Sequence, residues 1–581
     1  MTQKRFLEAI IVGSGFGGAV MCCRLAMRWP GEVLLLERGK RYPKGSFARS
    51  PHDFAANFWA PAEDGQARKL NGLFDIRNYR RMDSVVSAGL GGGSLIYANV
   101  FMPAPAWVFG PRWPAQISAT TLAPYYRVAQ SVLAARPVPP AEGDARRTIQ
   151  RTSLYADFAR ADGRTSRAAD IAVFFGKGYA SRQSGPLPLG EQERNRYGAT
   201  QTSCTYCGEC DVGCNVHAKN TLDLNYLFAA EKQHGALVET GSEVTRITPL
   251  SEAGEPDSTA DGRYGYRVDY RDDAGTPLHA LARRVVVAAG TLGTNELLLR
   301  CRDTLGTLPR LSQRLGHGFS GNGDFLSFVS GGTRAADPTY GPVITQFIDY
   351  GLQQPTPGQP SFMLEDAAYP AFAAWYVEGL RPAAGLSYLF NRIARTFKVF
   401  KQRWVDQLFS GKWSGSMSAY AHTALQGDLS YRSSVLLFMG QDAADGTLHL
   451  HRGRLALDWP QSSSRPLYDA IVACGKRFQQ FAGASTYFPQ PTWAWPVRNN
   501  ITVHPLGGCA LAEEPAHGVV SSLPGARGQV FGYQRLYVAD GSLLPTGVGA
   551  NPSATIAALA EWIAEDITGM TPDDTLGVPH A

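Results

Sequence analysis

The feature that most constrains this chain is the stretch AIIVGSGFGGAVMCCRLA near its N-terminus. An apolar run is followed by Gly13, Gly15 and Gly18 in the pattern G-x-G-x-x-G, and then by a helix-forming segment. The first glycine permits a tight turn, the second lets the backbone approach a pyrophosphate, and the third lets the helix pack against the strand. A second apolar run, in EVLLLERG, ends at Glu37. A ribose-binding carboxylate is expected about 20 residues after the glycine motif, which is where Glu37 stands. The stretch therefore predicts a strand–turn–helix unit that binds the ADP part of a dinucleotide.

Length and composition are those of a multidomain globular protein. The chain has 581 residues, of which 44% are hydrophobic and 18% charged, and this length predicts two or more domains. A net charge of +6 without a long Lys/Arg run gives no sign of nucleic-acid binding. No apolar run is long enough to span a bilayer, and the N-terminal apolar stretch leads into a glycine turn without a cleavage site. We therefore expect a cytoplasmic protein.

Further glycine-rich segments suggest which dinucleotide is bound. SAGLGGGSLIYANV, from Ser87 to Val100, has three consecutive glycines that let backbone lie against a flat ring or a phosphate. RRVVVAAGTLGTNELLLR is another strand–turn–helix pattern. LYVADGSLLPTGVGANPSATIAALAEWIAEDI sets Asp540 at a strand end and closes with an Ala-rich helix that starts near Pro552.

These segments, together with GFSGNGDF and HPLGGC, resemble the glucose–methanol–choline (GMC) FAD-dependent oxidoreductases, and within them the cholesterol oxidase branch. The resemblance extends from about residue 10 to residue 560. It implies FAD as the cofactor and an α/β fold with two domains. A doubly wound, Rossmann-like FAD-binding domain would be built from residues 1–45, 80–100, 215–330 and 495–575. An α+β substrate domain with an antiparallel sheet would be built from residues 101–214 and 331–494, with the Cys-rich segment 203–214 near the junction.

The resemblance also assigns roles to individual positions. It implies that the ADP half is held by Gly13, Gly15, Gly18, Glu37 and Val244, that the flavin is approached by Gly92, Gly93, Ser94 and Asn322, and that the ribityl–phosphate end is held by Asp540 and Gly541. His504 and Asn551 match the catalytic pair of the family. A histidine is suited to receive the proton of an alcohol because its pKa lies near neutrality. An asparagine can hold the substrate oxygen without carrying a charge.

One residue type of the cholesterol oxidase branch is missing where we expect it. Isomerising members use a glutamate to move a steroid double bond, and the matching strand here reads GDLSYRSSVLLFMGQDAADG. The corresponding position falls near Ser430, and no Glu lies between Asp428 and Gln441. Glu365 and Asp366, in FMLEDAAYP, are expected to be surface or salt-bridged acids, with entry into a pocket as the alternative. The substrate expected is therefore a bulky hydrophobic, steroid-like alcohol, without a firm assignment to sterols.

A basic amphipathic helix is expected in FNRIARTFKVFKQRWVDQLF. Ile393, Phe397, Phe400, Trp404 and Leu408 recur at helical spacing, and arginines and lysines occupy the other face. The favoured interpretation is a helix packed on the substrate domain with its charges in water. The alternative is peripheral contact with an anionic membrane, from which a lipophilic substrate would be collected.

Four of the nine cysteines follow the spacing C-x2-C-x2-C-x3-C, at Cys204, Cys207, Cys210 and Cys214. This is the bacterial ferredoxin spacing, and it predicts an iron–sulfur cluster of the 4Fe–4S or 3Fe–4S type that relays electrons from the flavin. Against it, Asn215 stands where ferredoxins place proline, and the chain has no second run. A structural zinc site, disulfides and free thiols are the alternatives.

The expected activity is oxidation of a hydrophobic alcohol to the carbonyl, with hydride transfer to flavin N5. The electron acceptor would be O2, a quinone or a redox protein. A flavin-bearing lyase or another non-redox enzyme of the same fold is the alternative, because one fold hosts several chemistries.

Overall fold

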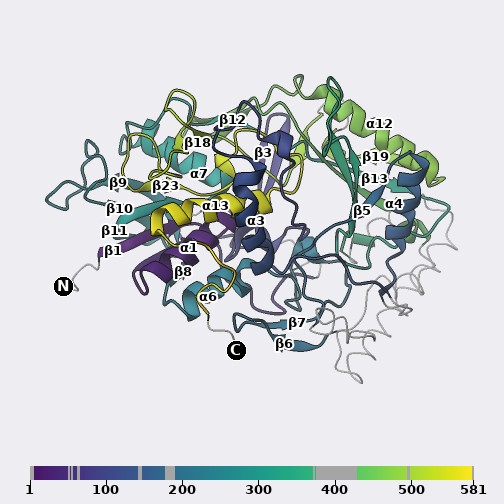
Figure 1. Ribbon diagram of the computed structural model, residues 1–581, viewed down its shortest axis with the longest axis horizontal. Helices are drawn as coiled ribbons and strands as arrows, with labels where there is room; N and C mark the ends of the chain where they lie inside the picture. The colour runs from purple at the N-terminus through teal and green to yellow at the C-terminus, as the bar shows by residue number, and fades with distance from the viewer. Residues whose placement is uncertain are drawn as a thin grey trace.

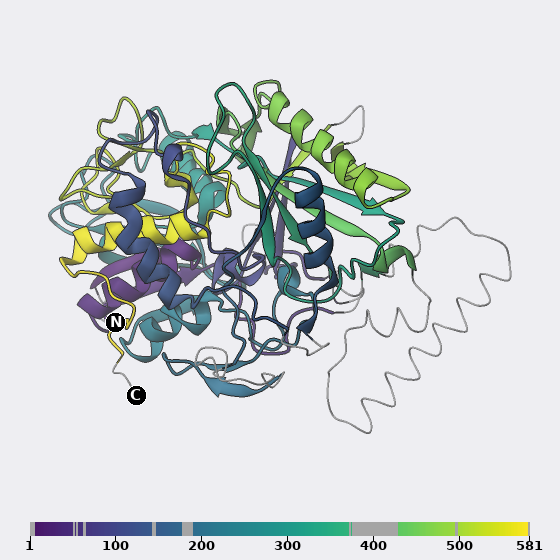
Figure 2. The same cartoon turned by 45° about the vertical axis from the view of Figure 1, so that its right-hand side comes forward.

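The computed structural model describes residues 6–49, 53, 56–61, 66–141, 147–176, 190–370, 373–374, 428–493 and 498–578. Two large sheets, each with helices on its outer side, make up its two halves (Figures 1 and 2). The first surrounds the N-terminal strand, and the second carries α12 (Arg465–Phe481) and α4 (Gln150–Ala161) at the opposite end of the molecule.

The first sheet is seven-stranded, with the order β8-β2-β1-β11-β10-β9 and with β23 paired to the end of β11. Its strands are β1 (Phe6–Val12), β2 (Val33–Glu37), β8 (Leu237–Thr240), β9 (Glu243–Pro249), β10 (Tyr266–Arg271), β11 (Pro277–Val287) and β23 (Leu536–Val538). The run β8, β2, β1, β11 and β23 is parallel, whereas β10 and β9 are antiparallel additions. The parallel run is the arrangement of a dinucleotide-binding sheet, so the predicted α/β, doubly wound fold is confirmed.

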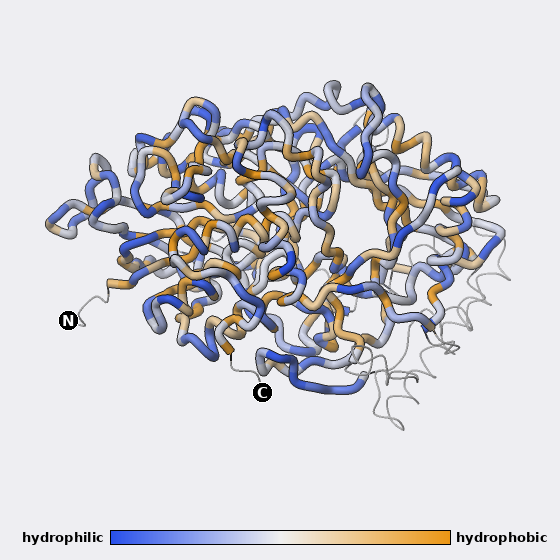
Figure 3. The backbone as a smooth tube through the Cα atoms, viewed as in Figure 1, coloured by the Kyte–Doolittle hydropathy of each residue, from blue (hydrophilic) through white to orange (hydrophobic). Residues whose placement is uncertain are grey.

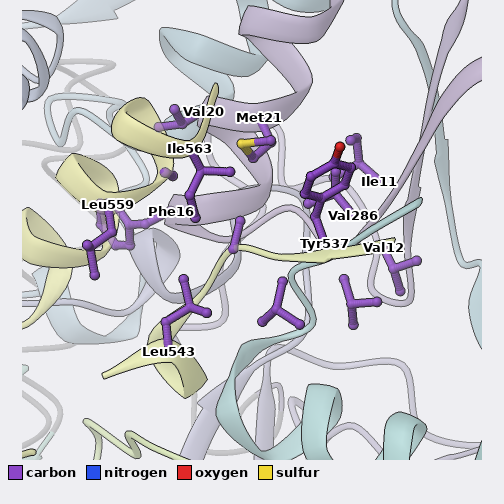
Figure 4. Packing of buried hydrophobic residues seen from close by; sticks show 14 of the residues in the cluster. Ile11, Val12, Phe16, Val20, Met21, Val286, Tyr537, Leu543, Leu559 and Ile563 are labelled. Carbon is purple, nitrogen blue, oxygen red and sulfur yellow. The ribbon is translucent and has the colours of Figure 1, made fainter. Parts of the chain in front are cut away.

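Helices cover this sheet because its central strands are apolar on both faces. The helices are α1 (Phe16–Arg28), α3 (Ala119–Val132), α6 (Tyr226–Lys232), α7 (Gly290–Leu299) and α13 (Ser553–Thr568). α1 packs on β1, β2 and β11, and its outer side meets α6 and α13. Figure 4 shows Phe16, Val20 and Met21 of α1 beside Leu559 and Ile563 of α13. Burying each such side chain contributes about 1.5–3 kcal/mol.

The second sheet is antiparallel, with the order β19-β13-β16-β15-β14-β5. Its strands are β5 (Ser166–Ala168), β13 (Phe325–Ser330), β14 (Gln346–Tyr350), β15 (Phe362–Ala367), β16 (Ser434–Gly440) and β19 (Thr486–Pro489). One face packs against α4 (Gln150–Ala161) and α12 (Arg465–Phe481), whose apolar residues join a separate core cluster. The predicted substrate domain with an antiparallel sheet is thus present.

Four smaller sheets accompany the two large ones in the described residues. They contain β3 (Phe74–Tyr79), β4 (Met82–Ser87) and β20 (Asn500–Thr502), then β12 (His317–Phe319), β17 (Gly446–His451) and β18 (Arg454–Asp458), and the two-stranded pairs β6 (Gln192–Arg194) with β7 (Thr200–Thr202) and β21 (Leu511–Ala512) with β22 (Val520–Ser521). Hydrophobic segments run through the strands and inner helices, and polar segments dominate the outer loops (Figure 3).

Two segments pack differently from the expected domain ranges. α3, expected in the substrate domain, lies along α13 of the nucleotide-binding half (Figure 1), and β13, expected in the FAD-binding domain, is a central strand of the second sheet. Among the helices that the structure describes, none is long and apolar enough to cross a membrane. The amphipathic segment around Ile393 to Leu408 lies outside the described residues.

Candidate active site

A cavity of about 1420 Å³ runs from the glycine turn of β1 to the inner face of the second sheet. It exceeds the usual 300–1,000 Å³ of a pocket for one small ligand, so it has room for a cofactor and a substrate together. Of the predicted site residues, it is lined by Gly13, Gly15, Glu37, Gly92, Gly93, Val244, His504, Asp540, Gly541 and Asn551. Residues far apart in the sequence are therefore gathered around one space.

The glycine turn has the geometry that its sequence predicted. Gly13 has φ of +94°, and a Cβ on Gly18 would lie 2.1 Å from the carbonyl oxygen of Gly13, so both positions require glycine. A Cβ on Gly15 would meet nothing within 4 Å, because that side of Gly15 faces open space. α1 begins directly after Gly15 without a side-chain cap. Its free N–H groups and positive dipole end therefore suit a phosphate.

Glu37 is buried at the end of β2 and is held by the same turn. Its carboxylate accepts hydrogen bonds from Ser14 Oγ at 2.5 Å, Ser14 N at 3.1 Å and Gly39 N at 2.8 Å. A carboxylate offers about four acceptor positions, so one remains for a ribose hydroxyl. Val244 lies in the same part of the wall, at the start of β9.

The second glycine loop approaches the first one closely. Gly92 has φ of +51°, and a Cβ there would lie 2.6 Å from Gly15 Cα. Gly92 and Gly93 line the cavity, but Ser94 is not among the lining residues. The Ser94 hydroxyl donates to Gly91 O at 2.7 Å and accepts from Leu222 N at 3.1 Å. Ser94 therefore holds the loop in shape.

Asp540 and Gly541 line the cavity where β23 ends. Asp540 Oδ1 accepts from Ser542 N and Ser542 Oγ, and Oδ2 accepts from Thr294 Oγ1 at 2.5 Å. Burial raises the pKa of Asp540, and these hydrogen bonds oppose the rise. Asp540 thus ties β23 to α7 at the edge of the site.

His504 is fixed by a carboxylate that the sequence analysis did not single out. His504 Nδ1 lies 2.8 Å from Asp324 Oδ1, and Asp324 Oδ2 accepts from Val503 N at 2.9 Å and His504 N at 3.2 Å. The histidine side chain is 15% exposed and lines the cavity, whereas Asp324 is 4% exposed. Within the described part of the chain, His504 Nε2 has no hydrogen-bond partner.

Asn551 lines the same cavity, and its Oδ1 is buried without a partner among the described residues. Asn322 secures the loop that carries it: Asn322 Nδ2 donates to Ala550 O, and Asn322 Oδ1 accepts from Val548 N and Gly549 N. Asn322 does not line the cavity. Its amide is committed to positioning Asn551, which leaves the Asn551 amide oxygen available to a substrate.

Glu365 does not behave as the expected surface or salt-bridged acid. It lies on β15, is 0% exposed, and has no hydrogen bond to either oxygen within the described structure. Burial raises its pKa well above the usual range, and the nearby Asn551 amide only partly opposes this. Asp366, by contrast, is salt-bridged as expected, to Arg151 at 3.5 Å. All six residues of β15 are buried, and an acid within such an apolar run is the signal that could have indicated Glu365.

Glu365 lies on the strand next to the one where the isomerase glutamate was expected. In the antiparallel pairing of β15 with β16, Glu365 stands opposite Leu437. Ser430 lies before β16, in the short helix α11 (Asp428–Tyr431), and its Oγ is 2.7 Å from Tyr369 Oη. The absence of a glutamate near Ser430 is therefore no indication that the site lacks one.

The far wall of the cavity is apolar. It is formed by the inner face of the second sheet and the segment after β15, with Leu326, Phe328, Ala367, Ala368, Tyr369, Val435 and Leu437. His504 and Asn551 thus lie between a polar, glycine-rich half of the cavity and an apolar half. This arrangement suits a hydrophobic substrate that presents one polar group to the pair.

The four cysteines lie in one region, but three of them differ in local structure. Cys204 N bonds to Phe174 O, Cys207 forms a bridge with Gly341, and Cys210 begins a short 3-10 helix. Their sulfurs are close enough that Cys210, Cys207 and Cys214 add to the burial effect that raises the pKa of Cys204. All four are free thiols.

The predicted iron–sulfur site is not supported. Among the residues that the structure describes, no group of three or more His, Cys, Asp or Glu is arranged to hold a metal. Spacing along the chain brings the cysteines together, but it does not make four sulfurs converge when each residue follows a different backbone path. Asp211 and Val212, between Cys210 and Cys214, line the cavity, so the segment does lie beside the candidate site.

Sequence models of the GMC oxidoreductase family match residues 189–316 and 454–560. A cholesterol oxidase of Acinetobacter baumannii is 27% identical over 579 residues, which cover 95% of this chain and 93% of the relative. A cholesterol oxidase of Mycobacterium tuberculosis is 28% identical over 580 residues, covering 97% and 91%. The chain belongs to the GMC oxidoreductase family. It is thus an FAD-dependent oxidoreductase, as predicted.

Solved structures agree at the level of the fold. Pyridoxine 4-oxidase from Mesorbium loti aligns with this GMC oxidoreductase with a TM-score of 0.57 and 15% identity, covering 97% of this chain and 99% of the other. A fungal aryl-alcohol oxidase aligns with a TM-score of 0.53 and 14% identity, covering 98% and 99%.

Proposed function

We propose that this GMC oxidoreductase oxidises the hydroxyl group of a bulky hydrophobic alcohol, with a sterol as its substrate class. The observation that carries the proposal is one continuous cavity with a glycine-rich end, a His504–Asn551 pair and an apolar wall. The relatives named cholesterol oxidase, similar over nearly the whole chain, support a sterol.

FAD fits the cavity on the features of this chain alone. Gly15 offers open space beside the uncapped start of α1, where a pyrophosphate would accept hydrogen bonds from the free N–H groups of the helix. Glu37 would bind the adenosine ribose. Val244 would lie against the adenine, Gly92 and Gly93 against the flavin, and Asp540 and Gly541 along the ribityl–phosphate chain. When bound, FAD supplies the acceptor for the electron pair that leaves the substrate carbon with its hydrogen.

The protein's own part of the reaction is to hold and deprotonate the hydroxyl group. Asn551 donates to or accepts from the substrate oxygen through an amide that is otherwise free at Oδ1. His504 Nε2 takes the hydroxyl proton, since Nδ1 is engaged by Asp324. The wall around Leu326, Phe328 and Leu437 holds the apolar body of the alcohol and excludes water.

The test is to add cholesterol to the anaerobic, FAD-loaded protein and to follow the visible flavin spectrum. Bleaching is expected with cholesterol and not with ethanol, which cannot occupy the apolar wall. An H504Q variant that still binds FAD should bleach about 100- to 10,000-fold more slowly. If no alcohol bleaches the flavin, the proposal is refuted and the non-redox alternative, a flavin-bearing lyase, takes its place.

A second activity, a shift of the steroid double bond after oxidation, is favoured by Glu365. Its buried side chain has no cationic or hydrogen-bonding partner in the described structure, and the Asn551 amide is nearby. The ionised form of this desolvated side chain is a strong proton acceptor, so the fraction of the protein in which Glu365 has lost its proton could remove a proton beside the new carbonyl and return it at the far end of the double bond. An E365Q variant should still oxidise cholesterol but should accumulate the unconjugated ketone, which ultraviolet absorbance distinguishes from the conjugated one. Equal yields of the conjugated ketone from both proteins would exclude this role.

We propose O2 as the electron acceptor, with peroxide as its product, because the oxidases among the relatives and structural neighbours support it. The thiols of Cys204, Cys207, Cys210 and Cys214 are not arranged as a ligand set in the described structure, so we route no electrons through them. A quinone or a redox protein remains the alternative acceptor, and peroxide yield per oxidised alcohol distinguishes the cases. A cytoplasmic location and peripheral membrane contact stay predictions of the sequence.

A further inference from the structure

We propose that Asp324 is a positioning residue that holds His504 in the tautomer with its proton on Nδ1, so that Nε2 is the proton acceptor facing the cavity. This inference deepens the proposed function and rests on it for the role of His504. The tautomer itself is determined by the hydrogen bonds around the buried carboxylate of Asp324.

The two carboxylate oxygens of Asp324 contact different groups. Oδ1 faces His504 Nδ1 at 2.8 Å. Oδ2 accepts from the backbone N–H groups of Val503 at 2.9 Å and His504 at 3.2 Å. Thr502 Oγ1 also lies 3.0 Å from Oδ2. The carboxylate therefore binds both the ring of His504 and the backbone that carries it.

The contact with Oδ1 determines the protonation of the ring. An ionised carboxylate only accepts hydrogen bonds, so a neutral His504 must present a protonated Nδ1 to Oδ1. The remaining nitrogen, Nε2, then carries a lone pair and has no partner among the described residues. The proton on Nδ1 leaves Nε2 free to take the hydroxyl proton of the alcohol, as general base catalysis requires.

In the described part of the chain, His504 is the ionic partner of Asp324. Among the ion pairs of the described residues, none joins Asp324 to a lysine or arginine, and His504 is its single basic contact. The backbone on the far side of His504 is also fixed, since Gly507 has φ of +85° and a Cβ there would lie 2.1 Å from Gly318 O. The ring is thus oriented from both sides, and among the described residues it is Asp324 that selects its tautomer.

These contacts determine what Asp324→Asn would do. The amide oxygen must occupy the Oδ2 position, because an NH2 group there would face the N–H groups of Val503 and His504. The NH2 group is then directed at His504 Nδ1, which must become an acceptor. The ring proton moves to Nε2, so that Nε2 can no longer receive the substrate proton. A buried Asp-to-Asn change beside a catalytic histidine imposes the wrong tautomer in serine proteases for the same reason.

The experiment measures the tautomer directly by two-bond 1H–15N NMR on the full chain, loaded with FAD and labelled with 15N-histidine. An H504Q variant identifies the His504 signals by their loss. We expect Nδ1 to be protonated in the wild type and Nε2 to be protonated in D324N. In the steady state with cholesterol, kcat of D324N should fall about 100- to 10,000-fold, while KM changes little.

The matched control is D442N. Asp442 is also buried and holds the same loop, because it accepts from Ser320 Oγ at 2.6 Å and Gly321 N at 2.9 Å, but it has no hydrogen bond to His504. D442N should keep the wild-type tautomer, so a change confined to D324N separates tautomer selection from loosening of the loop. A D442N protein with its proton on Nε2 would count against the inference.

Either of two outcomes would overturn the proposal: a proton on Nε2 in the wild type, or a proton that stays on Nδ1 in D324N. If D324N does not fold, the wild-type spectrum alone decides. The tautomer can switch even if cholesterol does not bleach the flavin, and in that case the proposed function fails while the positioning role stands. If cholesterol bleaches the flavin but the tautomer of D324N does not switch, the proposed function stands and the positioning role of Asp324 fails.

Discussion

The buried carboxyl of Glu365 should make the stability of this protein depend on pH in a way that one substitution removes. Burial raises the pKa of Glu365 well above its usual range, and the neighbouring Asp366 and Asp324 add to the rise. In the unfolded chain Glu365 ionises near pH 4.3. Above that pH the folded protein therefore holds one proton that the unfolded chain has released.

Proton linkage determines the direction and the size of the change in the free energy of unfolding with pH. Because the folded pKa is the higher one, the stability is fully present below the unfolded pKa and is lost as the pH rises toward the folded pKa. A difference of one bound proton changes the free energy of unfolding by about 1.4 kcal/mol per pH unit. E365Q cannot ionise, so the free energy of unfolding of E365Q minus that of the wild type should grow as the pH rises from 5 to 7, by at most about 3 kcal/mol.

The assay is guanidinium unfolding of both proteins at several pH values from 4 to 8. Other buried acids are common to the two proteins and cancel in the difference. D442N is the matched control, because burial raises the pKa of Asp442 only to about 6. The free energy of unfolding of D442N minus that of the wild type should grow above about pH 4 and become constant above about pH 6. A difference between E365Q and wild type that stays within about 0.5 kcal/mol from pH 5 to pH 7 would refute the reasoning, since it would mean that Glu365 has an ordinary pKa.

Three further predictions concern the cofactor site and the cysteine segment. G15A should keep the stability of the FAD-free protein but weaken FAD binding in a fluorescence titration, because its Cβ projects into the cavity. G18A should destabilise the FAD-free protein by more than about 2 kcal/mol in denaturant unfolding, because its Cβ would lie 2.1 Å from Gly13 O. K219M should cost about 3 kcal/mol in the same assay, because the buried Lys219 ammonium donates to the carbonyls of Leu95 at 3.0 Å, Tyr97 at 2.8 Å and Cys210 at 2.7 Å; an unchanged midpoint would show that water replaces it. Iron and sulfide analysis of anaerobically purified protein should find flavin without stoichiometric iron, and three or four irons per chain would restore the iron–sulfur hypothesis for Cys204, Cys207, Cys210 and Cys214.

The nucleotide-binding half of the fold could be predicted from the sequence because its signals are local. The turn at Gly13 needs glycine for its own backbone angle, and Glu37 ends the very next strand. His504 and Asn551 were recognised from short motifs, and the structure brings both to one cavity. Whether they act as the catalytic pair remains a prediction.

The rest depends on contacts between distant segments, which spacing does not reveal. Asp324 meets His504 across 180 positions of sequence, and nothing in NGDF indicates that partner. Glu365 was misjudged because both faces of β15 are covered, which the strand's own sequence does not reveal. The cysteine spacing was read as a ligand set, although the chain path around each residue decides whether sulfurs converge. In each case the missing information was three-dimensional.

The cavity takes its two ends from separate sheets, and this has a consequence for how such a protein can change. The residues that would grip the cofactor come from the parallel sheet and its glycine turns, whereas the apolar wall comes from β13, β15 and β16. Replacing Leu326, Phe328 or Leu437 would reshape the substrate chamber without touching a single residue of the dinucleotide cradle. New substrates can therefore be acquired by altering one sheet alone, with the redox machinery inherited intact.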